Sequence, residues 1–186
     1  GTNLPDDLAA TLGGATGKGN RMDEYTDYGA ELGGPIWKDR LWAWGAYGKT
    51  DVTVLTILGT PDQTILDNRS LKVTGQATQN IRGSYTYFRG DKLKYGRNAS
   101  ASRPPETTYN QTGPTPVNKG ELNVVLGNNL FVTGRAATVG GGFQLAPQGG
   151  LEAKWYRTDD GVHHGSHDLY KTDRPQTTFS ADGNYF

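Results

Sequence analysis

Cysteine is absent from this chain of 186 residues. Its absence excludes disulfide frameworks, thiolate zinc sites and cysteine nucleophiles, while it leaves the cellular compartment open. Charge of one sign is not in excess either, because 19 basic side chains balance 19 acidic ones. Without a net field or a run of like charges to attract a polyanion, no nucleic-acid partner is expected.

Long hydrophobic runs are also missing. The densest apolar stretches are 41–48 and 52–58, well short of the roughly 18 residues that a membrane-spanning helix needs. Any membrane span in this chain must therefore be made of strands. The chain starts at Gly1 with neither an initiator Met nor a signal peptide, and a strand-like pattern runs up to Phe186, so we expect a fragment of a longer protein.

Alternation of apolar and polar side chains is the main signal that is present, and it is typical of strands with two different faces. In 28–34, the side chains Tyr28, Ala30 and Leu32 point to one side, and Glu31 points to the other. Segment 41–49 is apolar on both sides, which leaves its facing open. The other alternating segments are 71–78, 81–87, 121–126, 130–136 and 179–185.

Short and long connections alternate between these segments. We expect tight turns at 35–40, 79–80 and 127–129, and long polar loops at about 50–68, 90–116 and 140–175. The strands should have about 9 to 12 residues, which suits a membrane-crossing strand. Aromatic residues near the strand ends would form interfacial girdles: Tyr25, Tyr28, Trp37, Tyr85, Tyr87 and Tyr185. A soluble β-sandwich has the same alternation, and the pattern alone does not exclude it.

A resemblance to a known family rests on residues 27–45, which read DYGAELGGPIWKDRLWAWG. This run resembles the early barrel hairpin of TonB-dependent transporters, particularly the Oar-like group, in which Tyr-Gly, an acidic residue, Gly-Gly-Pro-Ile, a basic residue and Asp precede an aromatic-rich strand. Segments 103–116 and 173–186 are also similar to barrel segments of that group.

The resemblance implies an all-β fold, namely an antiparallel transmembrane β-barrel wall of about 7–8 strands with short periplasmic turns and long extracellular loops. Residues 25–186 would form this partial barrel, and residues 1–24 an extracellular loop or lead-in segment. Seven or eight strands cannot close a transporter barrel of about 22 strands, so the chain would have two open edges.

The function that the resemblance implies is part of a TonB-dependent receptor in the outer membrane of a Gram-negative bacterium, which takes up an unidentified ligand. The expected partners are outer-membrane lipid and lipopolysaccharide, together with a plug domain and TonB through the parent chain. A non-transport barrel or a surface adhesin built on the same wall is the alternative. Neither a cofactor nor an enzymatic activity is expected.

Two sets of candidate residues follow. The polar sides of the strands should face the barrel interior, where charge is tolerated, on the concave face of the sheet: Glu31, Lys72, Gln76, Arg82, Glu121, Asn123 and Arg135. Four basic residues of the expected 90–116 loop could contact lipopolysaccharide phosphates or an anionic ligand, or could simply be solvated: Lys92, Lys94, Arg97 and Arg103.

The remaining candidate chemistry favours ordinary loop roles. The histidines are His163, His164 and His167, near Asp159 and Asp160 in a Gly-rich polar segment. We interpret this segment as a loop tip and expect no metal site there. Adjacent carboxylates before a glycine are more typical of turns than of a general acid and base. The pair Asp6 and Asp7 is interpreted in the same way.

Overall fold

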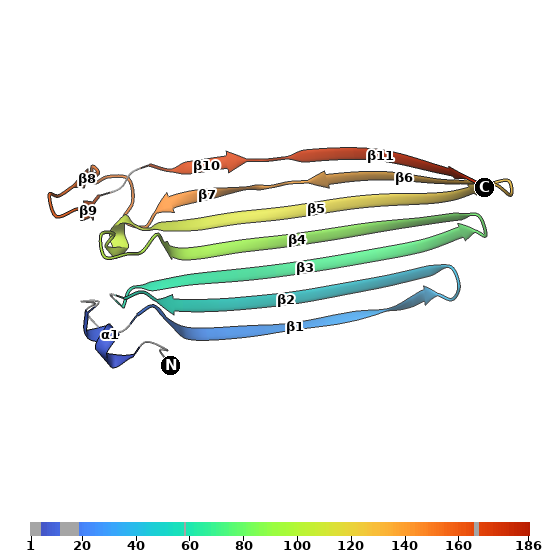
Figure 1. Cartoon of the computed structure of the whole chain (residues 1–186). Coiled ribbons are helices and arrows are strands. Elements are labelled where there is room, and N and C mark those ends of the chain that lie inside the picture. The colour runs from blue at the N-terminus through green and yellow to red at the C-terminus, as the bar shows by residue number, and fades with distance from the viewer. Residues whose placement is uncertain (1–4, 12–18, 58, 166–167) are drawn as a thin grey trace.

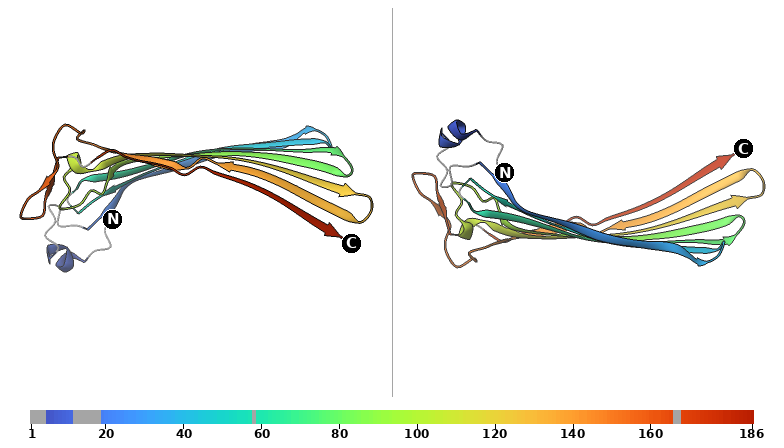
Figure 2. Two further views of the ribbon diagram at one scale, coloured as in Figure 1. Left: turned by 90° about the horizontal axis from the view of Figure 1, so that it is seen from above. Right: turned by 90° about the horizontal axis from the view of Figure 1, so that it is seen from below.

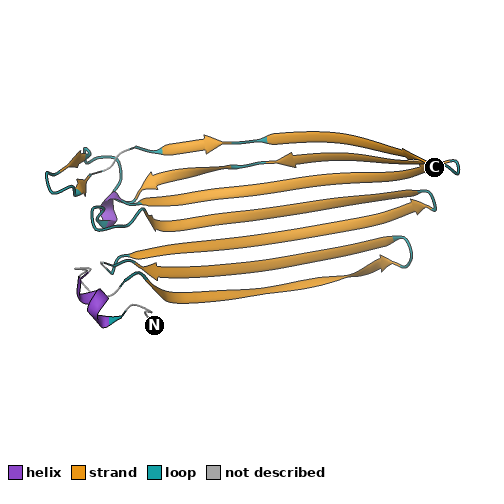
Figure 3. Cartoon of the chain, in the orientation of Figure 1, coloured by secondary structure: helices purple, strands orange, loops and turns teal. Residues whose placement is uncertain are grey.

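The chain folds as an all-β protein in a computed structural model that describes residues 5–11, 19–57, 59–165 and 168–186 (Figure 3). The described elements in chain order are α1 (Asp6–Thr11), β1 (Arg21–Trp37), β2 (Leu41–Leu55), β3 (Pro61–Thr78), β4 (Ile81–Arg97), η1 (Pro105–Thr107), β5 (Tyr109–Leu126), β6 (Leu130–Val139), β7 (Gly142–Pro147), β8 (Tyr156–Arg157), β9 (His163–His164), β10 (Tyr170–Asp173) and β11 (Gln176–Tyr185).

Nine of the strands form one antiparallel sheet, in the order β1-β2-β3-β4-β5-β6-β11 (Figure 1). From β1 to β6 each strand pairs with the next one in sequence, as in a meander, and β6 then pairs with β11. The strands β7 and β10 lie outside this path, because β7 continues along β5 where β6 has ended, and β10 pairs with β7. The sheet is therefore seven runs wide, in agreement with the lower end of the expected number.

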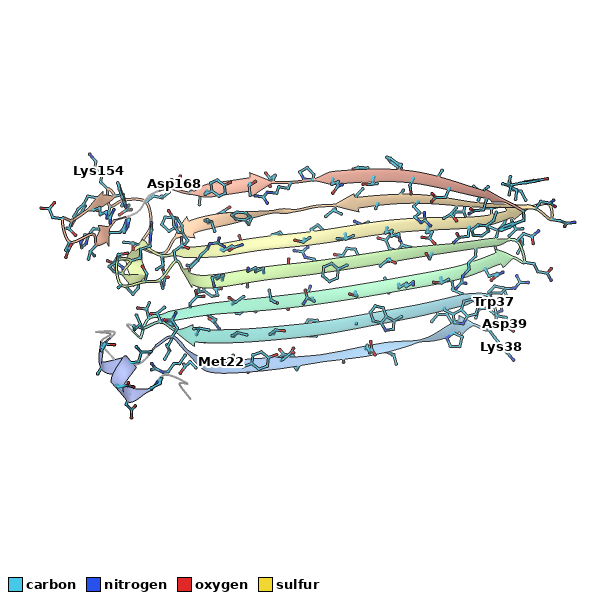
Figure 4. All side chains as sticks on the ribbon, in the orientation of Figure 1. Met22, Trp37, Lys38, Asp39, Lys154 and Asp168 are labelled. Atoms are coloured by element: carbon cyan, nitrogen blue, oxygen red, sulfur yellow. The ribbon has the colours of Figure 1, made fainter. Side chains whose placement is uncertain are left out.

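The tight turns share one end of the sheet, as the sequence predicts (Figure 1). They lie between β1 and β2, β3 and β4, and β5 and β6. Asp39, with φ of 61°, allows the first turn to close on a hydrogen bond from Arg40 N to Trp37 O of 3.0 Å. Figure 4 labels Trp37, Lys38 and Asp39 at this turn end, and Lys154 and Asp168 at the opposite end, which carries the longer connections.

The strands are longer than predicted. β3 and β5 have 18 residues each, and β1 and β4 have 17. The expected loop at 50–68 shrinks to 56–60, and the expected loop at 90–116 shrinks to 98–108. At about 3.3 Å per residue, an 18-residue strand is about 60 Å long, twice the thickness of a hydrocarbon core.

Prolines in β5 explain why the second loop was overestimated. Pro114 and Pro116 pair with Asp91 and Arg89 of β4 in an unbroken register. A proline cannot donate to a ladder, but Gly140 N donates to Pro116 O at 2.8 Å, so Pro116 turns its backbone groups toward the β6–β7 side. There the neighbouring strand is interrupted between Val139 and Gly142, and no ladder hydrogen bond is lost.

The start of the chain differs from prediction in two places. Residues 1–24 were expected to form a loop, but α1 lies within them and β1 already begins at Arg21. β1 also runs to Trp37, through the expected turn residue Pro35. A register shift between Pro35 and Trp37 accommodates this proline. Residues 1–4 and 12–18 lie outside the described residues.

The sheet is a single layer, twisted and bowed along its length, with β1 and β11 at opposite edges (Figure 2). Within the described residues, Tyr109 is the one buried side chain of the aliphatic and aromatic residues. Leu71 and Leu122, which a sandwich would bury together, are 42% and 50% exposed. The described sheet is therefore neither a two-layer sandwich nor a closed barrel.

Candidate functional site: the two faces of the sheet

Strand register assigns each side chain to one side of the sheet, because residues paired across antiparallel strands point the same way. We call the side that carries Glu31, Lys72 and Arg135 the polar face, and the side that carries Leu71 and Leu122 the apolar face. Figure 4 shows side chains on both sides of the ribbon.

The seven residues predicted to share an interior surface all lie on the polar face. Their register pairs link neighbouring strands directly: Gln76 with Arg82, Arg82 with Asn123, and Glu121 with Arg135. The prediction that these seven side chains share one face of the sheet therefore agrees with the strand register. That this face lines a barrel interior stays a prediction.

An ion-pair network crosses three strands of the polar face. Arg135 on β6 lies between two carboxylates, with its Nε 3.0 Å from Glu121 Oε2 on β5 and its Nη1 bonded to Asp182 on β11. Asn123 donates to Glu121 at 3.1 Å and accepts the hydroxyl hydrogen bond of Thr133 at 2.7 Å. Charged groups on this face thus satisfy one another without water having to supply every partner.

Two tryptophans of β2 extend the polar face toward β1. The register also shows which face each side chain of segment 41–49 occupies. Trp42 and Trp44 point to the polar face, while Leu41, Ala43 and Tyr47 point to the apolar face. The indole Nε1 of Trp44 donates to Glu31 Oε2 at 3.3 Å. Alternation alone could not decide this, because both sides of the segment are apolar.

The apolar face carries the leucines and valines near the turn end. Its members in β3, β5 and β6 fall on one side in the register: Leu71, Val73, Leu122, Val124, Leu126, Leu130 and Val132. Tyr185 and Trp37 border this area at the turns, whereas Tyr28, Tyr47 and Tyr87 border it farther along the strands. Tyr25, expected in the same girdle, lies on the polar face. It is three positions from Tyr28, and residues an odd number of positions apart in a strand point to opposite faces.

The character of the apolar face changes at its tyrosine border. Arg69 and Arg89 pair with each other in the cross-strand row of Tyr47, one row beyond Tyr87, and Lys49, Asp67 and Asp91 lie in the following row together with Tyr28. Between the turns and this change, β2 contributes 41–47 and β5 contributes 118–126. These lengths correspond to about 20 to 27 Å along the strands, close to the apolar band of about 25 Å in outer-membrane barrels.

The predicted loop cluster of basic residues is wrong for three of its members. Lys92, Lys94 and Arg97 lie in β4, because the strand continues to Arg97. Lys94 bonds to Asp62 and, at 3.4 Å, to Thr64, both on β3, while Arg97 bonds to Gln111 on β5. Arg103 alone lies in the 98–108 connection, in a bridge with Ser100. The four do not form one basic surface.

A packed tip at the loop end was not predicted. Thr107 and Thr108 of the η1 region are 2% and 0% exposed. The Thr108 hydroxyl lies 2.6 Å from Pro105 O and 2.9 Å from Gln148 Oε1, which joins the 98–108 connection to the end of β7. Burial raises the pKa of the neighbouring Tyr109 hydroxyl. Short polar residues beside prolines gave no periodic signal from which this core could have been found.

The histidine segment forms the small hairpin of β8 and β9. His163 Nδ1 accepts a hydrogen bond from Trp155 Nε1 at 3.1 Å, and the ring of His164 stacks on Tyr156 with centroids 4.7 Å apart. His167 lies outside the described residues. In the ranges that the structure describes, no group of three His, Asp or Glu side chains is arranged to hold a metal ion.

The carboxylate pair Asp159 and Asp160 lies in the turn of this hairpin. Asp160 accepts hydrogen bonds from the hydroxyl of Thr158 and from Val162 N, the latter at 3.3 Å. The Thr158 hydroxyl, followed by the Val162 amide, lowers the pKa of Asp160. Its observed role is to form a turn. Asp6 and Asp7 lie in the first turn of α1, rather than in the loop turn expected from the sequence.

No described helix is both long and apolar enough to cross a membrane. Comparison of the chain with models of protein families, with curated proteins and with solved structures gives no match.

Proposed function

We propose that this chain forms part of the wall of an outer-membrane β-barrel in a Gram-negative bacterium. The observation that carries the proposal is the division of one long antiparallel sheet into an apolar face without a second layer and a polar face with a cross-strand ion network. In water the exposed leucines and valines would be unfavourable, whereas lipid chains would cover them.

The tyrosines and the change of polarity support this orientation. Aromatic side chains border both ends of the apolar area, as in interfacial girdles. Beyond Tyr47 and Tyr87 the strands continue with charged side chains on the same face, so the loop half of each strand would stand in the headgroups and the extracellular medium. Strands of 17 and 18 residues are long enough to cross the hydrocarbon layer and to continue beyond it.

Closure would require further strands. β1 and β11 each have an unpaired edge in the described sheet, and the hydrocarbon region does not tolerate unpaired backbone groups. We infer that the parent chain supplies the remaining strands and that the polar face then lines the interior. In this arrangement, most strands of the barrel belong to parts of the parent chain outside this sequence.

Transport rests on the resemblance of residues 27–45 to TonB-dependent transporters. In such a receptor the wall and its loops would admit an unidentified ligand, while the plug and TonB would act through the parent chain. A non-transport barrel or an adhesin would use the same wall. The discriminating observation is the parent sequence, because a plug with a TonB box supports transport and a parent chain without them supports the alternative.

The membrane assignment is tested by expressing residues 1–186 with and without a neutral detergent. We expect strand-rich circular dichroism in detergent micelles, and aggregation in their absence because the apolar face and the sheet edges associate. A sharp monomer boundary in sedimentation, combined with a cooperative thermal transition in plain buffer, would contradict the proposal.

A further inference from the structure

Two arginines face each other across β3 and β4 on the apolar face. Arg69 and Arg89 are register partners, one cross-strand row beyond the pair formed by Leu71 and Tyr87. Adjacent strands are about 4.8 Å apart, so the two guanidinium groups start from neighbouring positions on one surface. Like charges directly opposite each other destabilise a sheet, and such a pair calls for a counter-ion.

Neighbouring aspartates meet part of this need. Arg69 Nε lies 3.2 Å from Asp67 Oδ1, and Arg89 Nε lies 2.9 Å from Asp91 Oδ2. The aspartate side chains are 22% and 26% exposed, whereas those of Arg69 and Arg89 are 60% and 44% exposed. The cations therefore form the outer part of the cluster. Both ion pairs run through Nε, and a guanidinium has four further N–H donors for another acceptor.

Lys49 adds a third cation, in the row beyond, as the register partner of Asp67. In these two rows Lys49, Arg69 and Arg89 thus outnumber Asp67 and Asp91, and Asp51, the next acid of β2 on this face, lies one row farther along. Phosphate suits such a surface, because it offers several acceptor oxygens to paired guanidinium groups in fork geometry. A single carboxylate has fewer oxygens to share between two strands.

We propose that Arg69 and Arg89 bind a phosphate group of the outer-leaflet lipid, namely of the lipid A part of lipopolysaccharide. This inference rests on the proposed function, since only membrane insertion brings headgroups to this level. The position of the pair supports lipid as the source of the phosphate. The arginines lie at the tyrosine border of the apolar face, in the cross-strand row of Tyr47 and one row beyond Tyr87, where the headgroups of an inserted barrel begin.

The test uses the chain in maltoside micelles, with diphosphoryl lipid A as the probe and native mass spectrometry as the readout. The variant is Arg69→Gln with Arg89→Gln. Its control is Lys38→Gln with Arg40→Gln, which removes the same charge from the exposed turn between β1 and β2, away from the middle of β3 and β4 where the arginines lie. We expect the first variant to lose about tenfold or more in affinity, and the control to bind like the unaltered chain.

Further measurements separate phosphate recognition from general charge. Arg69→Lys with Arg89→Lys keeps the charge but lacks the fork geometry, so part of the affinity should remain. Dephosphorylated lipid A should bind the unaltered chain weakly, and inorganic phosphate at the same concentration should not displace the phosphorylated lipid. Equal binding of both lipids, unchanged affinity of the glutamine variant, or displacement by inorganic phosphate would each overturn the proposal.

The outcomes also distinguish the two proposals. Circular dichroism in micelles without lipid A shows whether each variant forms the strand-rich wall. A variant that forms the wall but binds lipid A normally refutes only the phosphate site. A soluble monomer without detergent refutes the membrane wall, and the lipid site with it.

Discussion

Gly33 lies beneath the indole of Trp44. A Cβ atom built on Gly33 would be 2.8 Å from Trp44 Cδ1 and 3.2 Å from Ala43 O. The glycine therefore allows the indole to lie over β1, where its Nε1 reaches Glu31. This contact links the edge strand to the aromatic part of the polar face.

Gly33→Ala should destabilise the β1–β2 hairpin by about 1 to 3 kcal/mol, because the added methyl group displaces Trp44 or the backbone. The measurement is urea unfolding in micelles, followed by tryptophan fluorescence. Gly34→Ala is the matched control, since a Cβ there meets nothing within 4 Å. Its effect should stay within about 1 kcal/mol. Equal losses in both variants would show that the indole does not depend on Gly33.

Val73→Arg should impair insertion into lipid vesicles, whereas Thr74→Arg should not. The register places Val73 on the apolar face and Thr74 on the polar face of the same strand. An arginine facing the lipid costs about 2 to 4 kcal/mol near the bilayer midplane. Protection from added protease reports insertion. If Thr74→Arg were the more damaging change, the assignment of the two faces would be reversed.

Thr108→Val should loosen the loop end without unfolding the sheet. Valine has nearly the same shape but lacks the hydroxyl proton, which is donated to Pro105 O or to Gln148 Oε1, so one of these part-buried acceptors would lose its donor at a cost of about 0.5 to 1.5 kcal/mol. Limited proteolysis should then cut the 98–108 connection faster. Thr112→Val, at an exposed position of β5, is the control and should leave the cleavage rate unchanged.

The β8–β9 hairpin should loosen in strong acid through Asp160. Its pKa in the folded hairpin is lowered, so the hydrogen bonds from Thr158 and Val162 contribute fully above the ordinary Asp pKa. That contribution is lost as the pH falls through the lowered pKa of the folded state. Amide exchange at Val162 should accelerate in that window. Asp160→Asn should remove the transition and Asp159→Asn should keep it. A transition that survives in Asp160→Asn would assign it to another group.

The sequence correctly predicted which side chains share a face of the sheet wherever apolar and polar residues alternate strictly. Glu31, Lys72 and Arg135 share a face because period-two spacing leaves no other outcome once the strands pair in register. The turns at 79–80 and 127–129 followed from their composition. Trp42 and Trp44 could not be placed, since their segment is apolar on both sides and only the neighbouring strands decide its facing.

Strand ends were the weaker part of the prediction, for a physical reason. Pro114 and Pro116 disfavour a central strand on local grounds, and only the gap between β6 and β7 makes room for them. The same longer strands moved Lys92 and Lys94 out of the expected loop. Arg69 and Arg89 lie 20 positions apart in sequence, and the β3–β4 register alone brings them together.

The most direct test of the membrane wall is the environment of two adjacent side chains. Because the chain has no cysteine, Leu71→Cys and Lys72→Cys each provide a single attachment site for a nitroxide spin label in lipid vesicles. We expect the label at Leu71 to collide mainly with oxygen dissolved in the lipid, and the label at Lys72 to be reached by a water-soluble nickel complex. A label at Leu71 as accessible to the nickel complex as the one at Lys72 would contradict a lipid-facing wall.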